Sequence, residues 1–324
     1  MRIAITGALG HIGSRLAREL AAGSPSTEVL LLDNLATQRY ASLFGLPANC
    51  QFAQVDVTAP GLERLLAGCS TVVHLAAMTD AAGSVDRAAE VERNNFHATV
   101  GVAQAAAACG AAVIHLSSTS VYGTQSTVVD EACGPEDLKP QSPYAETKLR
   151  EEAWLQQEAP KLGLRFITCR FGTIAGTSPG MRFHTAVNKF CWQAAMGQPV
   201  TVWRTAMHQK RPYLELGDAC AAIGHILRAD LFDGRIYNIL TANHTVDDIV
   251  TAIRQHVPTL EVRLVDERIM NQLSYEVLDA RIRATGWAPR GSIRTAITQT
   301  LELLGQRAPL PAHSRTATCT AAAP

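Results

Sequence analysis

A tyrosine and a lysine four positions apart form the most reactive pair in this sequence. Tyr144 and Lys148 lie in the segment 143–148, which begins a helical pattern. Residues four apart lie on the same face of a helix. A phenol ordinarily titrates at a pH of about 10, and a neighbouring ammonium favours its ionised form. We therefore expect Tyr144 to exchange a proton with a bound molecule near neutral pH.

A serine-rich segment supplies a third candidate for the same chemistry. Ser118 and Thr119 directly follow the apolar run Ala112–Ser117. The Ser118 hydroxyl can donate a hydrogen bond to the reacting oxygen and position it against Tyr144. A solvated helix face is the ordinary explanation of an isolated Tyr-x-x-x-Lys pair, and this context argues against it. The predicted catalytic residues are Ser118, Tyr144 and Lys148.

A glycine-rich loop near the N-terminus predicts a phosphate cradle. Glycines at positions 7, 10 and 13 stand between the apolar run Arg2–Thr6 and a helical pattern. They permit a tight turn, a close approach of the backbone to a pyrophosphate, and close packing of helix on strand. The N–H groups and the dipole of the helix N-terminus then attract the phosphates. The residues predicted to bind them are Gly7, Gly10, His11, Ile12 and Gly13.

An acidic residue at the end of the second apolar run indicates which dinucleotide binds. Asp33 lies 20 residues beyond Gly13, where a carboxylate can accept hydrogen bonds from the ribose hydroxyls of an adenosine. It would repel a 2′-phosphate. The glycine loop contains no Arg or Lys to compensate, although Arg39 follows a few residues later. The sequence therefore favours NAD over NADP as the cofactor.

Short continuous apolar runs alternate with helical patterns through the first half of the chain. Continuous runs are typical of strands buried on both faces. Alternation of strand and helix predicts an α/β fold with a Rossmann-type, doubly wound parallel sheet. The expected strands are Arg2–Thr6, Val29–Asp33, Cys50–Val55, Thr71–Ala76, Ala112–Ser117 and Arg165–Arg170.

The regular alternation fades after residue 173, near the Gly- and Pro-containing stretch 176–180. We expect an NAD-binding domain over 1–173 that shares some later strands with a smaller α+β substrate-binding region over 174–305. Residues 306–324 are rich in Ala, Thr and Pro and lack apolar periodicity, so we expect a disordered tail.

The composition argues against several classes of partner. The formal net charge of the 324 residues is zero and no basic patch stands out, which argues against nucleic acid. No apolar run approaches the length of a membrane span and no signal peptide is visible, so we expect a cytoplasmic protein without a membrane partner. The eight cysteines are scattered and form no Cys-x-x-Cys pair. We expect reduced thiols and no metal.

Taken together, these motifs resemble the extended short-chain dehydrogenase/reductases, in the NAD-dependent epimerase/dehydratase branch typified by UDP-glucose 4-epimerase. The resemblance covers residues 1–303 and includes the glycine loop and the Tyr144/Lys148 pair. Its further motifs are Leu32-Asp33-Asn34-Leu35, Asp56-Val57, Val73-His74-Leu75-Ala76-Ala77, Asn95, Ser117-Ser118, Arg170, Arg211-Pro212-Tyr213 with Asp218, and Gly286-Trp287-Ala288-Pro289.

The resemblance implies roles for residues beyond the catalytic ones. It places Asp56 and Val57 beside the adenine and gives Asn95 a supporting role. Arg211 resembles an arginine that grips a nucleotide diphosphate, although a surface ion pair would also explain it. Besides the glycine loop, the implied cofactor-binding residues are Asp33, Asn34, Asp56, Val57, Leu75, Ala76, Ala77, Asn95, Tyr144 and Lys148. The implied substrate-binding residues are Ser118, Thr119, Thr173, Arg182, Arg204, Arg211 and Arg268.

The residues before Tyr122 distinguish the reactions of this family. Similar 4,6-dehydratases place Asp-Glu where Thr119-Ser120 stand, and decarboxylases usually have Glu in place of Ser120. Neither acid is present, which favours 4-epimerisation of a nucleotide sugar through a transient 4-keto intermediate. Thr173 replaces an Asn common in such epimerases, and 268–272 lacks their Arg-x-Gly-Asp loop, so the sugar and the nucleotide stay open.

Two alternatives to the epimerase remain. An NAD(P)-dependent reductase or dehydrogenase of a keto-sugar or other carbonyl compound would consume its cofactor, whereas an epimerase should retain NAD. A non-catalytic dinucleotide-sensing protein is the second alternative, and the presence of both Tyr144 and Lys148 argues against it. The Ala-rich helix over 100–109 and the Tyr144 helix could form the interface of a homodimer, or pack only within one chain.

Overall fold

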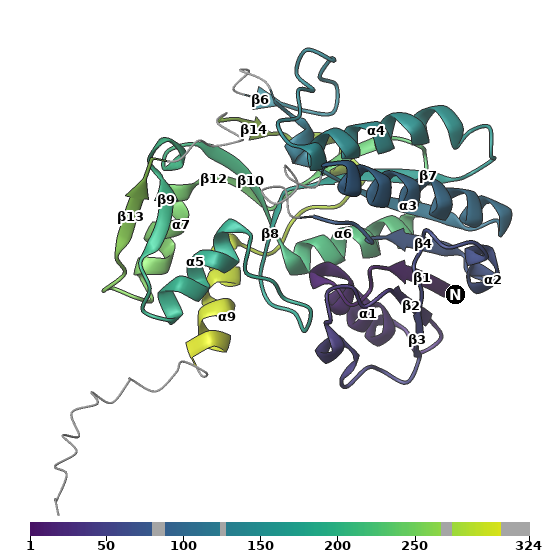
Figure 1. Ribbon diagram of the computed structural model, residues 1–324, viewed down its shortest axis with the longest axis horizontal. Coiled ribbons are helices and arrows are strands. Elements are labelled where there is room, and N and C mark those ends of the chain that lie inside the picture. The colour runs from purple at the N-terminus through teal and green to yellow at the C-terminus, as the bar shows by residue number, and fades with distance from the viewer. Residues whose placement is uncertain (80–87, 124–127, 267–273, 306–324) are drawn as a thin grey trace, which may run out of the picture.

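A computed structural model describes residues 1–79, 88–123, 128–266 and 274–305 (Figure 1). The described residues form a seven-stranded sheet with the order β11-β7-β5-β4-β1-β2-β3, and all its neighbouring strands are parallel. The predicted Rossmann-type α/β fold is therefore confirmed. The strands are β1 (Arg2–Thr6), β2 (Glu28–Asp33), β3 (Cys50–Gln54), β4 (Thr71–His74), β5 (Ala112–Ser118), β7 (Phe166–Phe171) and β11 (Ile236–Ile239).

Helices cover both faces of this sheet (Figure 1). Successive strand residues point to opposite faces, so Ile3 and Ile5 join one apolar cluster and Ala4 joins the other. The first cluster lies under α1 (His11–Gly23), α6 (Leu216–Ala229) and α8 (Ala280–Arg283). The second lies under α2 (Leu62–Leu66), α3 (Ala88–Ala108) and α4 (Pro143–Glu158).

The later part of the chain builds a smaller α+β region beside the sheet, seen on the left of Figure 1. A third apolar cluster forms its core. Its helices are α5 (Ala186–Ala195), α7 (Val246–Arg254) and α9 (Ile293–Gly305). Its small sheets are β12-β10-β8 and β13-β9, formed by β8 (Thr173–Ala175), β9 (Val200–Trp203), β10 (Lys210–Glu215), β12 (Ala242–Thr245) and β13 (Val262–Val265). A separate two-stranded sheet pairs β6 (Val128–Val129) with β14 (Glu276–Val277), and both strands contribute to a fourth apolar cluster.

The two regions are not separated cleanly along the chain. β11 comes from the later part of the chain but pairs with β7 at the edge of the large sheet. The domain boundary at residue 173 stays a prediction. Arg268 and the expected tail over 306–324 lie outside the described residues.

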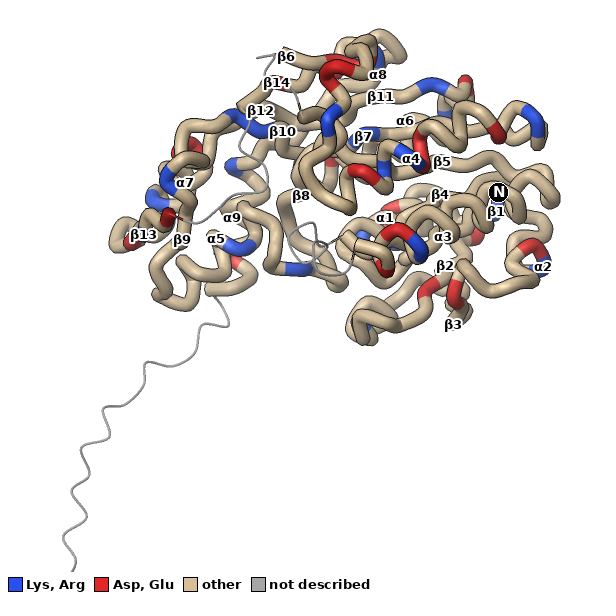
Figure 2. Tube along the Cα trace, turned by 45° about the horizontal axis from the view of Figure 1, so that its top comes forward, with Lys and Arg blue, Asp and Glu red and all other residues tan. Residues whose placement is uncertain are grey.

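Acidic and basic residues are both spread over this architecture. Figure 2 shows acidic and basic residues interspersed along the chain, in line with the formal net charge of zero. Among the helices of the described ranges, none has the length and apolarity needed to cross a membrane.

The strand order reverses between β1 and β4, which lie side by side although β2 and β3 come between them in sequence. In open α/β sheets, ligands bind beyond the carboxyl ends of the strands at such a reversal. The glycine loop follows β1 and the segment 75–79 follows β4. The fold therefore places two of the predicted cofactor segments at the edge of the sheet where a ligand is expected.

Candidate active site

The glycines of the first loop are required by different local constraints. Gly7 has a φ of 62°, in the left-handed region that favours glycine, and a Cβ there would lie 2.7 Å from the backbone nitrogen of Ala76. A Cβ at Gly13 would lie 2.7 Å from the Cα of Ala8, so α1 packs closely on the turn. Gly10 precedes α1 and makes no side-chain cap. The N-terminus of α1 therefore presents N–H groups suited to an anion.

Asp33 supports this loop from the carboxyl end of β2. Its Oδ2 accepts a hydrogen bond from the Leu9 N–H (3.1 Å), and its Oδ1 accepts one from the Leu35 N–H (2.9 Å). Arg39 is half-buried, and its Nη1 lies 3.7 Å from where a Gly10 Cβ would stand. Burial lowers the pKa of Arg39, and the Asp33 carboxylate acts in the opposite direction. One cation thus lies beside the glycine loop, although no basic residue stands within it.

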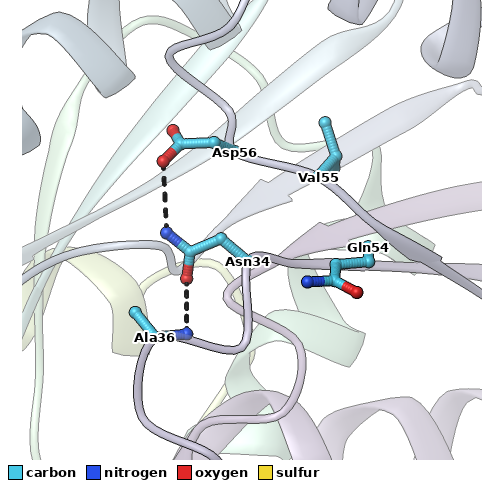
Figure 3. Close-up of a pocket in the computed structure, with 5 residues that line it drawn as sticks. All are labelled: Asn34, Ala36, Gln54, Val55 and Asp56. Carbon is cyan, nitrogen blue, oxygen red and sulfur yellow. Dashed lines mark hydrogen bonds between the residues drawn. The ribbon is translucent and has the colours of Figure 1, made fainter.

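A cavity of about 470 Å³ opens beyond the carboxyl ends of β2 and β3, lined by Asn34, Ala36, Gln54, Val55 and Asp56 (Figure 3). The Asn34 side-chain amide donates to Asp56 Oδ2 (3.3 Å) and accepts from the Ala36 N–H (3.0 Å). Hydrogen bonds from the hydroxyl and N–H of Thr58 lower the pKa of Asp56. The cavity thus has an anionic, polar rim. Val57 is buried and lines a neighbouring hollow instead.

The segment after β4 is tied to the sheet by two buried side chains. The Thr6 hydroxyl oxygen accepts hydrogen bonds from the N–H groups of Leu75 and Ala76, both at 3.2 Å. Asn95 on α3 accepts from the Met78 N–H (2.8 Å) and donates to the Met78 carbonyl (2.9 Å). These bonds hold 75–78 against the glycine loop. Asn95 therefore acts on this groove through the backbone that it positions.

The α4 helix carries the tyrosine–lysine pair at its first two turns. Ser142 caps this helix, its hydroxyl oxygen accepting from the Ala145 N–H (3.2 Å). The Lys148 Nζ is buried and lies 6.0 Å from the centroid of the Tyr144 ring. Burial raises the pKa of Tyr144, and the Lys148 ammonium acts to lower it. The expected acidifying lysine is in place, but burial has the larger effect on the pKa of the phenol.

Ser118 ends β5, one residue before the short helix η2 (Thr119–Val121). Its Oγ accepts hydrogen bonds from the Ser120 N–H (3.1 Å) and from the Ser120 hydroxyl (2.9 Å). These bonds orient the Ser118 oxygen and leave its own proton to donate. The Thr119 hydroxyl donates to the Phe171 carbonyl (3.2 Å) and is buried. Both hydroxyl side chains after Ser118 are therefore engaged in local hydrogen bonds.

A buried carboxylate, which sequence reasoning missed, contacts Lys148. Glu151 Oε2 accepts hydrogen bonds from Lys148 Nζ and from His115 Nε2, both at 2.8 Å. Burial by itself would raise the pKa of Glu151, but Lys148 and His115 outweigh it and bring that pKa to about 2. Glu151 is therefore ionised. Its spacing of three residues from Lys148 was a readable signal, whereas the approach of His115 depends on how α4 crosses β5.

The next residue of α4 makes a separate ion pair. Glu152 accepts from Arg170 at 2.6 Å (Nη2 to Oε2) and at 3.0 Å (Nε to Oε1), and both side chains are buried. Arg170 also donates to the Tyr122 hydroxyl (2.9 Å). This bidentate pair ties α4 to β7, which gives Arg170 a structural role in this fold.

Several predicted substrate residues gather near the end of β5. Tyr275 donates its hydroxyl to the Thr119 carbonyl (3.1 Å), and the Arg211 guanidinium lies 5.2 Å from the centroid of the Tyr275 ring. Thr173 begins β8 and pairs with Tyr213 in the neighbouring strand. Arg211 and Thr119 are thus linked through Tyr275, an aromatic residue that sequence reasoning did not select.

Two other predicted arginines lie elsewhere. The Arg182 guanidinium donates to the Thr79 hydroxyl, at the end of the segment after β4. Arg204 begins η3 (Arg204–Ala206) and pairs with Asp266 at 3.0 Å, with 58% of its side chain exposed. The structure therefore places Arg182 beside the cofactor groove and Arg204 in an exposed ion pair.

The later region also covers the glycine loop. His11 Nδ1 hydrogen-bonds to the Ser178 hydroxyl (2.8 Å), and the Gly180 N–H donates to the Ser14 hydroxyl (2.9 Å). Burial lowers the pKa of His11 to about 3, so the imidazole is neutral at physiological pH. The segment 176–182 is thereby fastened to the loop on which the phosphates of a dinucleotide would lie.

Comparisons with known proteins agree with this geometry. A model described as the NAD dependent epimerase/dehydratase family matches residues 3–239. A trifunctional UDP-glucose 4,6-dehydratase/UDP-4-keto-6-deoxy-D-glucose 3,5-epimerase/UDP-4-keto-L-rhamnose-reductase from Arabidopsis thaliana is 27% identical over 93% of this chain, and the chain spans 46% of that protein's length. A dTDP-glucose 4,6-dehydratase from Streptomyces niveus is 26% identical, with 93% of this chain and 92% of that protein covered.

A solved structure of similar fold is the UDP-glucuronic acid 4-epimerase of Bacillus cereus, in complex with UDP-glucuronic acid and NAD. It is 22% identical, with a TM-score of 0.86, and the alignment covers 95% of this chain and 100% of that one. At this identity the likeness concerns the fold.

Proposed function

This chain belongs to the NAD dependent epimerase/dehydratase family, and we propose that it is a nucleotide-sugar 4-epimerase that works through a transient 4-keto intermediate. The carrying observation is the pair Thr119-Ser120 directly after Ser118. Thr119 donates to a backbone carbonyl and Ser120 donates to Ser118. Neither side chain supplies the acid that eliminating water from a sugar requires.

The residues of the groove fit NAD. The left-handed Gly7, the uncapped N-terminus of α1 and the polar cavity at Asn34 and Asp56 match a pyrophosphate and an adenosine. The Asp33 carboxylate beside them favours ribose hydroxyls over a 2′-phosphate. When bound, NAD supplies a reversible acceptor for hydride. We assign the adenosine and pyrophosphate to the glycine loop, Asp33, Asn34 and Asp56, and the nicotinamide ribose to Lys148.

The catalytic trio then handles the proton. In its phenolate form, which the Lys148 ammonium favours, Tyr144 takes the proton of the 4-hydroxyl while C4 gives up its hydride, which leaves a ketone at C4. Ser118 donates a hydrogen bond to that oxygen and keeps it beside the phenol. After the sugar has turned and hydride has returned to the opposite face of C4, Tyr144 gives the proton back. The cycle consumes no cofactor and no proton.

The diphosphate is proposed to remain bound while the sugar turns. Arg211 is the first candidate to hold it, because its guanidinium lies over Tyr275, whose hydroxyl contacts the Thr119 carbonyl. Arg182 and Thr173 are the second candidates. Arg204 is a weaker one, because an exposed pair with Asp266 already engages it.

The homodimer also remains a proposal. Within the chain, α3 and α4 meet through Arg150, whose guanidinium lies 4.8 Å from the centroid of the Phe96 ring. Sedimentation equilibrium of the purified protein would give its oligomeric state.

A panel of nucleotide sugars tests the proposed function. The purified protein is incubated with each sugar without added cofactor, and the products are separated by chromatography. We expect one sugar to be converted to its 4-epimer, with NAD co-purifying with the protein. Strict dependence on added NADH or NADPH would favour the reductase, and loss of water would favour a dehydratase. Binding of NAD without any conversion would favour the non-catalytic alternative.

A further inference from the structure

Lys148 donates a hydrogen bond to a carboxylate that the proposed reaction does not use. A single oxygen, Glu151 Oε2, receives hydrogen bonds from both Lys148 Nζ and His115 Nε2, each at 2.8 Å. The His115 Nδ1 lies 3.4 Å from the Thr168 hydroxyl. Because a carboxylate oxygen can only accept, His115 donates to it through Nε2. This arrangement fixes the position of the carboxylate at a point where α4 crosses β5.

Stability does not account for these buried charges. The side chains of His115 and Glu151 are 0% exposed, and that of Lys148 is 4% exposed. A buried ion pair is often no more stabilising than apolar residues of the same volume. Glu151 Oε1 is buried as well and accepts a hydrogen bond from none of the described residues, which adds a further cost. An arrangement that costs stability beside a reactive pair points to a role in the reaction.

The charges around Tyr144 show what that role is. The Lys148 ammonium favours the phenolate, Glu151 on the same helix opposes it, and Arg182 from the later region favours it. Lys148 and His115 face Glu151 itself, and Glu152 lies next to it on α4. The neighbouring His74 has a pKa lowered to about 3 by burial, so it adds no charge near neutral pH. Glu151 is the anion that contacts Lys148 directly, and its charge opposes the effect of Lys148 on the Tyr144 phenol.

We propose that Glu151, held by His115, is a positioning residue that orients Lys148 and offsets the charge of Lys148 beside Tyr144, so that it sets the pH range in which the reaction runs. This proposal rests on the proposed role of Tyr144 as the proton carrier. It makes two separable claims, one about charge and one about position, and each has its own variant.

Glu151→Gln tests the charge. Glutamine keeps an oxygen that can accept from Lys148, but it removes the anion. The ammonium then acts on Tyr144 unopposed. The readout is the ultraviolet absorbance of the Tyr144 phenolate in NAD-loaded protein, obtained by subtracting the titration of the same protein with Tyr144→Phe. We expect the midpoint to fall by about one pH unit or more, the size typical of losing one nearby charge. A midpoint that stays or rises would overturn the proposal.

Glu146→Gln is the matched control for this titration. Glu146 lies between the catalytic pair in the sequence, but its side chain is exposed on the other face of α4. Its replacement removes the same charge from the same helix. We expect the Tyr144 midpoint to move by less than about a third of the shift in Glu151→Gln, because solvent screens an exposed charge. An equal shift in both variants would show a general charge effect and contradict a specific role of Glu151.

Glu151→Asp tests the position. Aspartate keeps the charge but shortens the side chain by one methylene, so it cannot hold Lys148 and His115 at the present distances. With a converted nucleotide sugar, we expect kcat to fall about tenfold or more while KM for the sugar changes less than about twofold. A wild-type kcat would overturn the positional claim. Since the titration uses no substrate, it still tests Glu151 if no nucleotide sugar is converted, an outcome that would contradict only the proposed function.

Discussion

On the cofactor side of the site, the predicted residues are determined by their contacts with main-chain atoms. Gly7 and Gly13 stand where a Cβ would meet a neighbouring main chain, and Asn95 holds the segment after β4 by two bonds to the backbone of Met78. On the substrate side, the arginine candidates are long side chains that meet other side chains, as Arg211 meets Tyr275 and Arg204 meets Asp266. Contacts with the main chain allow little variation in the residue type. Contacts between side chains allow a different ligand to bind after a few substitutions.

Replacing the Tyr144 phenol should lower activity more than any other substitution, because Tyr144 is proposed to act where the cofactor side and the substrate side of the site meet. We expect Tyr144→Phe to lower kcat by about a thousandfold or more, the upper part of the range for general acid–base groups. NAD should still bind, since the phenol oxygen takes no part in forming the glycine loop. Steady-state kinetics and NAD titration give the two quantities. Activity within tenfold of the wild type would show that another group carries the proton.

The backbone-determined side can be tested at Gly10. A Cβ there would lie 3.1 Å from the Gly7 carbonyl oxygen and 3.7 Å from the Arg39 side chain, so Gly10→Val requires a shift of a few tenths of an ångström in the loop. The branched side chain would occupy the approach to the N-terminus of α1. We expect NAD affinity to fall roughly a hundredfold, or about 2.7 kcal/mol, measured by calorimetry.

Gly23→Ala at the other end of α1, where a Cβ meets nothing within 4 Å, is the control. It should bind NAD as the wild type does. Unchanged affinity in Gly10→Val would place the pyrophosphate elsewhere and break the contrast drawn above.

The substrate side can be tested with a pair of arginines. Arg211→Ala should raise KM for the nucleotide sugar about tenfold with a smaller change in kcat, because it removes a charged contact to the diphosphate. Arg204→Ala should change KM less than about twofold, since an exposed ion pair is worth little. Initial-rate kinetics on both variants decide the matter. The reverse ranking would move the diphosphate toward η3 and Asp266.

Acid conditions should weaken the sheet region through its buried neutral histidines. His11 and His74 have pKa values lowered by burial to about 3, so the unfolded chain binds more protons between about pH 6.5 and 3. Stability must therefore fall as the pH falls through this window, by about 1.4 kcal/mol per pH unit for each histidine. Denaturant unfolding at several pH values measures this slope.

His74→Gln should make the slope shallower by one histidine, and the exposed His97→Gln should leave it unchanged. A wild-type stability that does not vary over this window would mean that both imidazoles are protonated in the folded protein.

The predictability of the molecule follows the same division. β1 was predicted with both its ends correct, because a continuous apolar run buried on two faces has few other interpretations. β4 was predicted to reach Ala76, but it ends at His74. The Leu75 N–H still bonds the Thr6 carbonyl, whereas the Ala76 N–H bonds the Thr6 hydroxyl. The later region was predicted only as mixed α+β. Most of its strands have only two to four residues, as β14 does, which is too few to show a period.

Within the site, motifs whose residues are close in the sequence could be predicted, whereas contacts between distant segments could not. The Tyr144/Lys148 spacing and the glycine loop are local, and the structure presents both as expected. His115 reaches Glu151 across 36 residues, and Tyr275 reaches Thr119 across 156. These pairings depend on how helices cross strands, which spacing along the chain does not encode.

The central claim is that one hydride leaves C4 and returns to C4 of the same sugar. A nucleotide sugar labelled with deuterium at C4 tests it directly, with the product examined by nuclear magnetic resonance and mass spectrometry. The account predicts a 4-epimer that keeps the deuterium at C4, with none released to free cofactor or solvent. Deuterium in free NADH, or at another carbon of the sugar, would contradict it.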